Sequence, residues 1–107
     1  MITAKFSFGN DLINGFEISG HSGYADEGSD IICSAVSSPA YMVVNTLTEI
    51  MRLTPEIETD DGYLSLKLNQ NDAGISKDIL KGFFLHIEEL SKEYPQFIKL
   101  ERGAYNA

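Results

Sequence analysis

The chain has 107 residues, enough for one ordinary domain and too few for two independent cores, so we expect one domain over residues 1–107. Hydrophobic residues make up 43% and charged residues 22%, which excludes a disordered chain and predicts a packed core. Eight basic and sixteen acidic residues give a net charge of −8, which disfavours direct nucleic-acid binding and favours cationic partners.

Two more classes are disfavoured at this level. The N-terminal residues lack the pattern of a signal peptide, and we find no apolar run approaching the roughly 18 residues of a membrane-spanning helix, so a cytoplasmic location without membrane contact is expected. The single cysteine excludes an internal disulfide and leaves a buried thiol, a reactive thiol or an intermolecular link.

The N-terminal part predicts a β-hairpin. Apolar and polar residues alternate from Ile2 to Phe8, the period of a half-buried strand. Turn residues follow at 9–11, and a second alternation around Phe16 and Ile18 ends at Gly20.

Residues 20–30 predict a loop, because the segment has three glycines and no apolar periodicity. Two interpretations of it stay open. Glycines permit unusual backbone angles, so the segment can be a mobile lid over a site, or it can be a surface connection.

Apolar residues then recur at helical spacing from Val36 to Ile50, which predicts a helix from about Cys33 to Leu53. Pro39 would remove one hydrogen bond inside this helix and favour a kink. Alternatively, Ser38 and Pro39 would suit the cap and first position of a helix that begins later.

The remainder predicts a second hairpin over 56–60 and 63–68, a helix over 73–93 and a short strand over 96–101. The order is ββαββαβ. Two helices against a mixed sheet of about five strands make a two-layer α/β domain.

The cysteine and one histidine form the candidate catalytic pair. Cys33 is predicted to open a helix, where unbonded backbone N–H groups and the helix dipole favour a thiolate and could stabilise an oxyanion. His21 lies twelve residues upstream, where the second strand ends, and could act as the base. The opposing interpretations are that Cys33 is an inert buried residue and that His21 is an ordinary loop residue.

Two neighbouring polar residues have open roles. Asp30 could orient the imidazole, although capping the helix after it is the preferred interpretation. Ser37 shares a helix face with Cys33, so its hydroxyl could bond to backbone or substrate, or merely fill space. No set of residues has the spacing of a zinc site or a nucleotide-binding loop, so no metal or cofactor is expected.

The segments 20–25 and 28–37 resemble the hallmark segment of the ribosomal-processing cysteine protease family, and the likeness extends over nearly the whole chain. The resemblance implies that His21 and Cys33 form a catalytic dyad. Gly20, Asp30 and Ser37 match other recurrent positions of the motif. Ser34 and Pro39 depart from the family pattern, and Pro39 puts the helix start in doubt.

The resemblance also implies what the enzyme acts on. The expected substrate is the basic N-terminal extension of large-subunit ribosomal protein twenty-seven, cut after paired phenylalanines, by a homodimer with a mobile loop over the active site. No cofactor is implied.

Two functions of other classes remain open. The chain could be a non-catalytic acidic adaptor that binds a basic ribosomal protein, and such an adaptor would bind the precursor intact. It could also be a thiol redox sensor, although the sequence has no second cysteine to resolve an oxidised sulfur.

Overall fold

A computed structural model describes residues 1–20 and 27–104, with the backbone alone for residues 27–30 and 104. Their elements, in chain order, are β1 Ile2–Gly9, β2 Leu12–Ser19, α1 Glu27–Asn45, a π-helical turn η1 Thr46–Ile50, β3 Glu56–Asp60, β4 Tyr63–Lys67, α2 Gln70–Ile75, α3 Lys77–Glu93 and β5 Ile98–Ala104.

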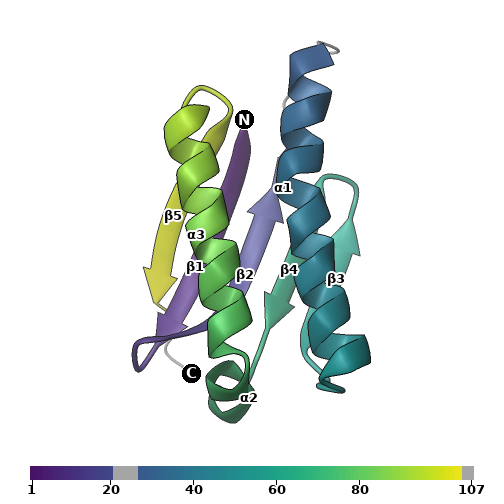
Figure 1. Cartoon of the computed structure of the whole chain (residues 1–107), viewed down its shortest axis with the longest axis vertical. Coiled ribbons are helices and arrows are strands. Elements are labelled where there is room, and N and C mark those ends of the chain that lie inside the picture. The colour runs from purple at the N-terminus through teal and green to yellow at the C-terminus, as the bar shows by residue number, and fades with distance from the viewer. Residues whose placement is uncertain (21–26, 105–107) are drawn as a thin grey trace.

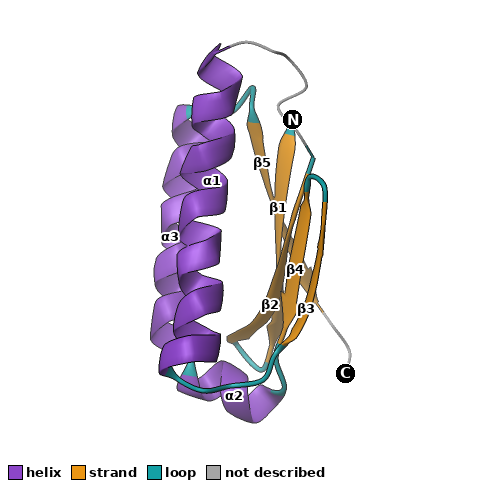
Figure 2. Ribbon diagram, turned by 90° about the vertical axis from the view of Figure 1, so that its right-hand side faces the viewer, coloured by secondary structure: helices purple, strands orange, loops and turns teal. Residues whose placement is uncertain are grey.

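The five strands form one sheet in the order β3-β4-β2-β1-β5. All neighbours are antiparallel except β1 and β5, which are parallel, so the sheet is mixed. Figure 2 shows α1 and α3 side by side on one face of the sheet, and α2 lies at one end of both layers (Figure 1). The predicted two-layer α/β fold and its mixed five-stranded sheet are therefore confirmed, with three helices in place of two.

Both predicted hairpins are confirmed, and each has a two-residue turn. Asn10 and Asp11 have φ values of 51° and 63°, the left-handed pair that matches the twist of the flanking strands. In the second hairpin Gly62 takes a φ of 67°, and the Asp60 side chain accepts a hydrogen bond from the Asp61 N–H at 2.7 Å. The turn of the second hairpin lies at the end of the sheet where β2 also ends, since Ser19 pairs with Tyr63.

The core lies between the sheet and the two long helices. Phe6 on β1 packs against Phe16 on β2 and Phe83 on α3, with ring centroids 6.0 Å and 5.4 Å away. The side chains that α1 and η1 bury against the sheet are Ile32, Val36, Ala40, Val43 and Leu47. Their spacing of four, four, three and four residues forms the inner stripe of one amphipathic helix.

The predicted start of the first long helix is wrong. α1 begins at Glu27, six residues before Cys33, so the last part of the predicted loop is helical. Ile32 explains the difference, because it is only 5% exposed and extends the buried stripe one turn towards the N-terminus. Pro39 lies inside α1, so the alternative of a later helix start is also wrong.

The other boundaries differ less. The predicted helix over 73–93 is two helices that meet at Ser76, and α2 begins three residues earlier, where Asn69 caps it by accepting a hydrogen bond from Asp72 N–H at 2.8 Å. Strand β5 continues three residues past Glu101, because it pairs with β1 along its whole length.

One finding about α1 and η1 runs against the sequence analysis. The stretch Ile31–Ile50 is long and apolar enough to cross a membrane by length and composition, the one such helix in the described part of the chain. Its inner stripe packs on the sheet, as in the core helix of a folded domain. Its outer side is partly apolar too, with Ile31 and Met42 exposed by 68% and 54%.

Candidate active site

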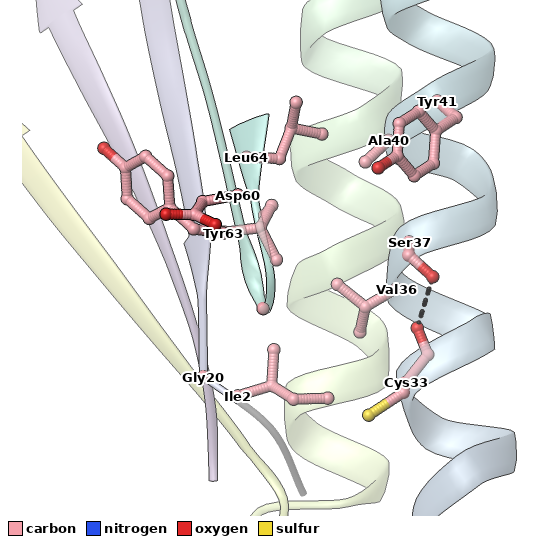
Figure 3. Close-up of a pocket in the computed structure, with 12 residues that line it drawn as sticks. Ile2, Gly20, Cys33, Val36, Ser37, Ala40, Tyr41, Asp60, Tyr63 and Leu64 are labelled. Atoms are coloured by element: carbon pink, nitrogen blue, oxygen red, sulfur yellow. Dashed lines mark hydrogen bonds between the residues drawn. The ribbon is translucent and has the colours of Figure 1, made fainter. Parts of the chain in front are cut away.

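A pocket of about 280 Å³ opens between α1 and the end of the sheet where β2 stops and β3 turns into β4 (Figure 3). The residues that line it are Ile2, Ile18, Gly20, Cys33, Val36, Ser37, Ala40, Tyr41, Asp60, Gly62, Tyr63 and Leu64. The lining residues come from five elements, β1, β2, α1, β3 and β4, and from the turns next to them. Three of the predicted site residues, Gly20, Cys33 and Ser37, therefore meet in one pocket.

Cys33, the chain's one cysteine, is half-buried in the pocket wall. Its sulfur points from α1 towards Ile2 at the start of β1 (Figure 3). Ser37 and Tyr41 follow at intervals of four residues and also line the pocket, so the three side chains form one stripe along the helix. At a rise of about 1.5 Å per residue the stripe is about 12 Å long.

The Ser37 hydroxyl donates a hydrogen bond of 2.8 Å to the Cys33 carbonyl oxygen (Figure 3). Of the interactions left open for Ser37, the structure shows the hydrogen bond to the backbone. The hydroxyl proton is engaged on the helix, while the oxygen can still accept a hydrogen bond from a group in the pocket.

The predicted activation of Cys33 by the helix start is wrong. Cys33 is the seventh residue of α1, and the N–H groups of residues 32–34 lie beyond the four at a helix start that have no intrahelical acceptor. The helix dipole also acts mainly within the first turn. Neither thiolate stabilisation nor an oxyanion site can therefore be derived from the N-terminus of α1.

Gly20 directly follows β2 and lines the pocket. Its N–H donates a 3.0 Å hydrogen bond to the Gly62 carbonyl, and its φ of +95° is one that L side chains rarely adopt. A Cβ atom at Gly20 would also overlap the carbonyl oxygen of Met1. This position consequently needs glycine.

The side chains of two predicted site residues, His21 and Asp30, lie outside the described part of the chain. His21 lies outside the described residues, as does the rest of the predicted lid over residues 21–26. Asp30 is the fourth residue of α1, so its predicted role as the cap of a helix opening at Cys33 is wrong, and its side chain is outside the described part.

The sequence analysis missed three polar residues of the pocket, namely Tyr41, Asp60 and Tyr63. Tyr41 could have been found, because it lies eight residues after Cys33 on the same helical face. Asp60 and Tyr63 depend on how β4 pairs with β2, which the sequence pattern does not encode. Among the described residues, no three His, Cys, Asp or Glu side chains are grouped to hold a metal ion.

Comparisons with known proteins agree on one family. The model of the family described as cysteine protease Prp matches residues 1–99. The ribosomal processing cysteine protease Prp of Bacillus subtilis (strain 168) is 23% identical to this chain, in an alignment that covers 94% of this chain and 96% of the relative.

Two solved structures have the same fold. SMU.848 from Streptococcus mutans superposes with a TM-score of 0.87 at 28% identity, over 98% of this chain and 96% of its own. The ribosomal processing protease Prp from S. aureus, in complex with a substrate peptide, superposes with a TM-score of 0.84 at 21% identity, over 95% of this chain and 99% of its own.

Proposed function

Since this chain belongs to the cysteine protease Prp family, we propose that it cuts a peptide bond with Cys33 as the nucleophile and His21 as the general base. The observation that carries the proposal is the position of Cys33. The one thiol of the chain lies half-buried in the wall of a pocket, where a substrate carbonyl can reach it, instead of being sealed in the core.

The backbone around Gly20 supports His21 as the partner. Gly20 lines the same pocket as Cys33 and is fixed by its hydrogen bond to Gly62. His21 is the next residue in the chain, so the proposed base directly follows a residue that lines the pocket. Because the helix start does not activate Cys33, the imidazole has to supply most of the activation.

The reaction follows from these two groups. His21 takes the proton of the Cys33 thiol, and the sulfur attacks the peptide carbonyl to form a C–S bond. The C–N bond then breaks, and His21 gives its proton to the departing amine. Water next attacks the thioester and passes one proton to His21. The C–S bond breaks, the thiolate leaves, and the leader's new carboxylic acid gives its proton to the solvent.

The substrate we propose is the basic N-terminal extension of large-subunit ribosomal protein twenty-seven, cut after paired phenylalanines. A net charge of −8 attracts a basic peptide. The stripe from Cys33 to Tyr41 is about 12 Å long, enough to contact three or four residues of extended peptide at about 3.3 Å each. The pocket of about 280 Å³ is at the small end for ligand sites, which suits single side chains of a peptide.

We also propose a cytoplasmic homodimer. Ile31 and Met42 are eleven residues apart, about three turns, so they lie on one outer face of α1, and both are largely exposed. Light scattering after gel filtration should give twice the mass of one chain for wild type and a single-chain mass for Met42→Lys. Leu85→Lys, which charges an exposed apolar position on α3, is the matched control and should stay dimeric.

The test of the proposed function is mass spectrometry of the precursor after incubation with wild type, Cys33→Ala or His21→Ala. Wild type should remove a leader ending in the paired phenylalanines. Cys33→Ala should leave the precursor intact, and His21→Ala should cut about 100- to 10,000-fold more slowly. Binding of an uncut precursor by all three proteins would support the acidic adaptor instead, and equal cleavage by Cys33→Ala would refute the assignment.

A further inference from the structure

Strand β3 has one edge that pairs with no other described strand. It is the terminal strand of the sheet, next to β4, and Figure 2 views the sheet from this side. All five of its residues, 56–60, are exposed, so no described element covers it. An uncovered edge offers backbone N–H and C=O groups to any further strand.

The hydrogen bonds of β4 show which groups face that edge. The Leu68 N–H donates a 2.8 Å hydrogen bond to the Asn14 carbonyl, in register with the ladder between β2 and β4. Hydrogen-bonded pairs alternate along an antiparallel ladder, so Leu66 and Leu64 also direct their backbone groups towards β2. The residues of β4 between them direct theirs towards β3.

Two residues of β3 therefore have backbone groups that point out of the sheet. Thr59 and Ile57 lie opposite Leu64 and Leu66, whose backbone groups bond to β2, so their own N–H and C=O groups face the free edge. Their side chains lie on the helix side, because Leu64 and Leu66 are buried there and directly opposed residues share a face. Ile57 is 36% exposed, which leaves apolar surface beside this edge.

The other face of β3 is acidic. Glu58 and Asp60 point away from the helices, and their partners on β4 are the uncharged residues Ser65 and Tyr63. Neither carboxylate forms an ion pair with a residue in the described ranges 1–20 and 27–104. A strand added to this edge would therefore meet negative charge on one face and an apolar side chain on the other.

The free edge also begins at the candidate active site. Gly62, in the turn after β3, lines the pocket, and so does Leu64, the partner of Thr59. An extended peptide that leaves the pocket on the side of this hairpin therefore reaches β3 next.

We propose that β3 is a docking edge for the substrate, to which an extended segment with lysine or arginine at every second position adds as a further strand. The proposal rests on the proposed protease function for its occupant, the basic precursor. Backbone bonds to Ile57 and Thr59 supply affinity. In an antiparallel arrangement the positions opposite Glu58 and Asp60 are non-hydrogen-bonded, where side chains come closest, so the two carboxylates select basic residues.

A second copy of this chain is a poorer occupant of the edge. Antiparallel pairing of two β3 strands centred on Glu58 would place Glu58 against Glu58 and Glu56 against Asp60. Like charges directly opposite each other are destabilising, and charged side chains commonly protect sheet edges from such pairing. The same charges favour a strand of opposite sign.

The test uses Cys33→Ala protein, to separate binding from cleavage, and two synthetic peptides of about eight residues, enough to span β3. One alternates lysine and valine, and the other has the same residues in two blocks. At about ten times Kd, the alternating peptide should slow hydrogen exchange at the Ile57 and Thr59 amides about tenfold, since exchange then requires the free protein. The Glu58 amide, already bonded to β4, should change little. Unchanged exchange at Ile57 and Thr59, or equal binding of both peptides, would overturn the proposal.

Methylating single peptide nitrogens separates backbone pairing from charge. Alternate amides of an added strand point to β3, and the amides between them point to solvent. A methyl group on one central amide should therefore abolish binding, while a methyl group on the next amide should leave it nearly unchanged. Equal effects of the two modifications would contradict strand addition.

Glu58→Gln tests the charge. It should weaken binding of the alternating peptide about two- to fivefold, the size of an exposed pair of opposite charges, and raise KM for the precursor by a similar factor without changing kcat. Glu93→Gln is the matched control, because it removes the same charge from an exposed position at the end of α3. Equal effects of the two variants would mean that only the overall charge matters, which would refute the role of β3.

Failure of this proposal differs from failure of the protease function. If wild type leaves the precursor uncut while Cys33→Ala protein binds the alternating peptide and protects Ile57 and Thr59, the protease function fails and the docking edge stands. If wild type cuts the precursor, but both amides stay unprotected and Glu58→Gln leaves KM unchanged, the protease function stands and the docking edge is refuted.

Discussion

Replacing Gly20 by alanine should damage both stability and catalysis, because the position combines three constraints. Its φ of +95° costs an L residue about 1–2 kcal/mol. The added Cβ would overlap the Met1 carbonyl oxygen, a backbone atom that cannot rotate away as a side chain would. Relieving that overlap would stretch the bond from Gly20 N–H to the Gly62 carbonyl, which is worth about 0.5–1.5 kcal/mol.

Together these terms predict a loss of about 2–3 kcal/mol in the free energy of unfolding. For a domain of this size that corresponds to a fall in Tm of roughly 10–20 °C. His21, the base that we propose, directly follows Gly20 in the chain, so we expect a backbone shift at Gly20 to impair catalysis as well. The value of kcat/KM, measured well below the new Tm, should therefore fall by more than the unfolded fraction explains.

Gly82→Ala is the control for this experiment. A Cβ at Gly82, on the exposed face of α3, meets nothing within 4 Å, and alanine in a helix interior is about 0.5–1 kcal/mol more favourable than glycine. This variant should raise Tm slightly and leave kcat/KM unchanged. A Gly20→Ala protein with the Tm and kcat/KM of wild type would refute the view that this position needs glycine for stability and catalysis.

Three further substitutions test the packing and the local bonds. Leu47→Ala leaves a cavity at a fully buried position of η1, and should lower the free energy of unfolding in urea by about 2–5 kcal/mol. Asn69→Ala removes the cap of α2 and should lower the free energy of unfolding by about 1 kcal/mol. Asn71→Ala, at an exposed position two residues further on, should lower it far less. Ser37→Ala removes the hydroxyl that donates to the Cys33 carbonyl oxygen. If this hydroxyl bonds to the backbone alone, Tm should be unchanged and kcat/KM should stay within about twofold of wild type. A larger loss of kcat/KM would mean that the hydroxyl contacts the substrate.

The hairpins could be predicted from the sequence because their signals are local. Alternating apolar residues define β1 and β4, and the turns at Asn10 and Gly62 use residue types that tolerate a positive φ. A period of two and a turn signal suffice for such an element, since the partner strand is the next one in the chain.

The start of α1 could not be predicted in the same way. Glycine and small polar residues from Gly28 to Asp30 indicate a loop by intrinsic preference, yet the helix includes them. Burial of Ile32 against the sheet stabilises the extra turns, and that contact depends on the tertiary structure. The error had a chemical consequence, because the activation proposed for Cys33 had assumed unbonded N–H groups beside it.

The site was predictable only in part. Cys33 and Ser37 share a helix face, so their meeting in one pocket follows from helical spacing, and Gly20 was indicated by the motif. The presence of Asp60 and Tyr63 in the pocket lining requires β4 to pair with β2, which brings the second hairpin beside the end of β2. That pairing joins segments more than forty residues apart, and no local pattern specifies it.

The thioester at Cys33 is the most direct test of the account. Reactions with the precursor should be quenched in acid at early times, and the protein digested and mapped by mass spectrometry. We expect a transient adduct that joins the leader's terminal carbonyl to the Cys33 sulfur and that is absent from Cys33→Ala. Cleavage that proceeds with Cys33 unmodified at every time sampled, and that persists in Cys33→Ala, would contradict the account.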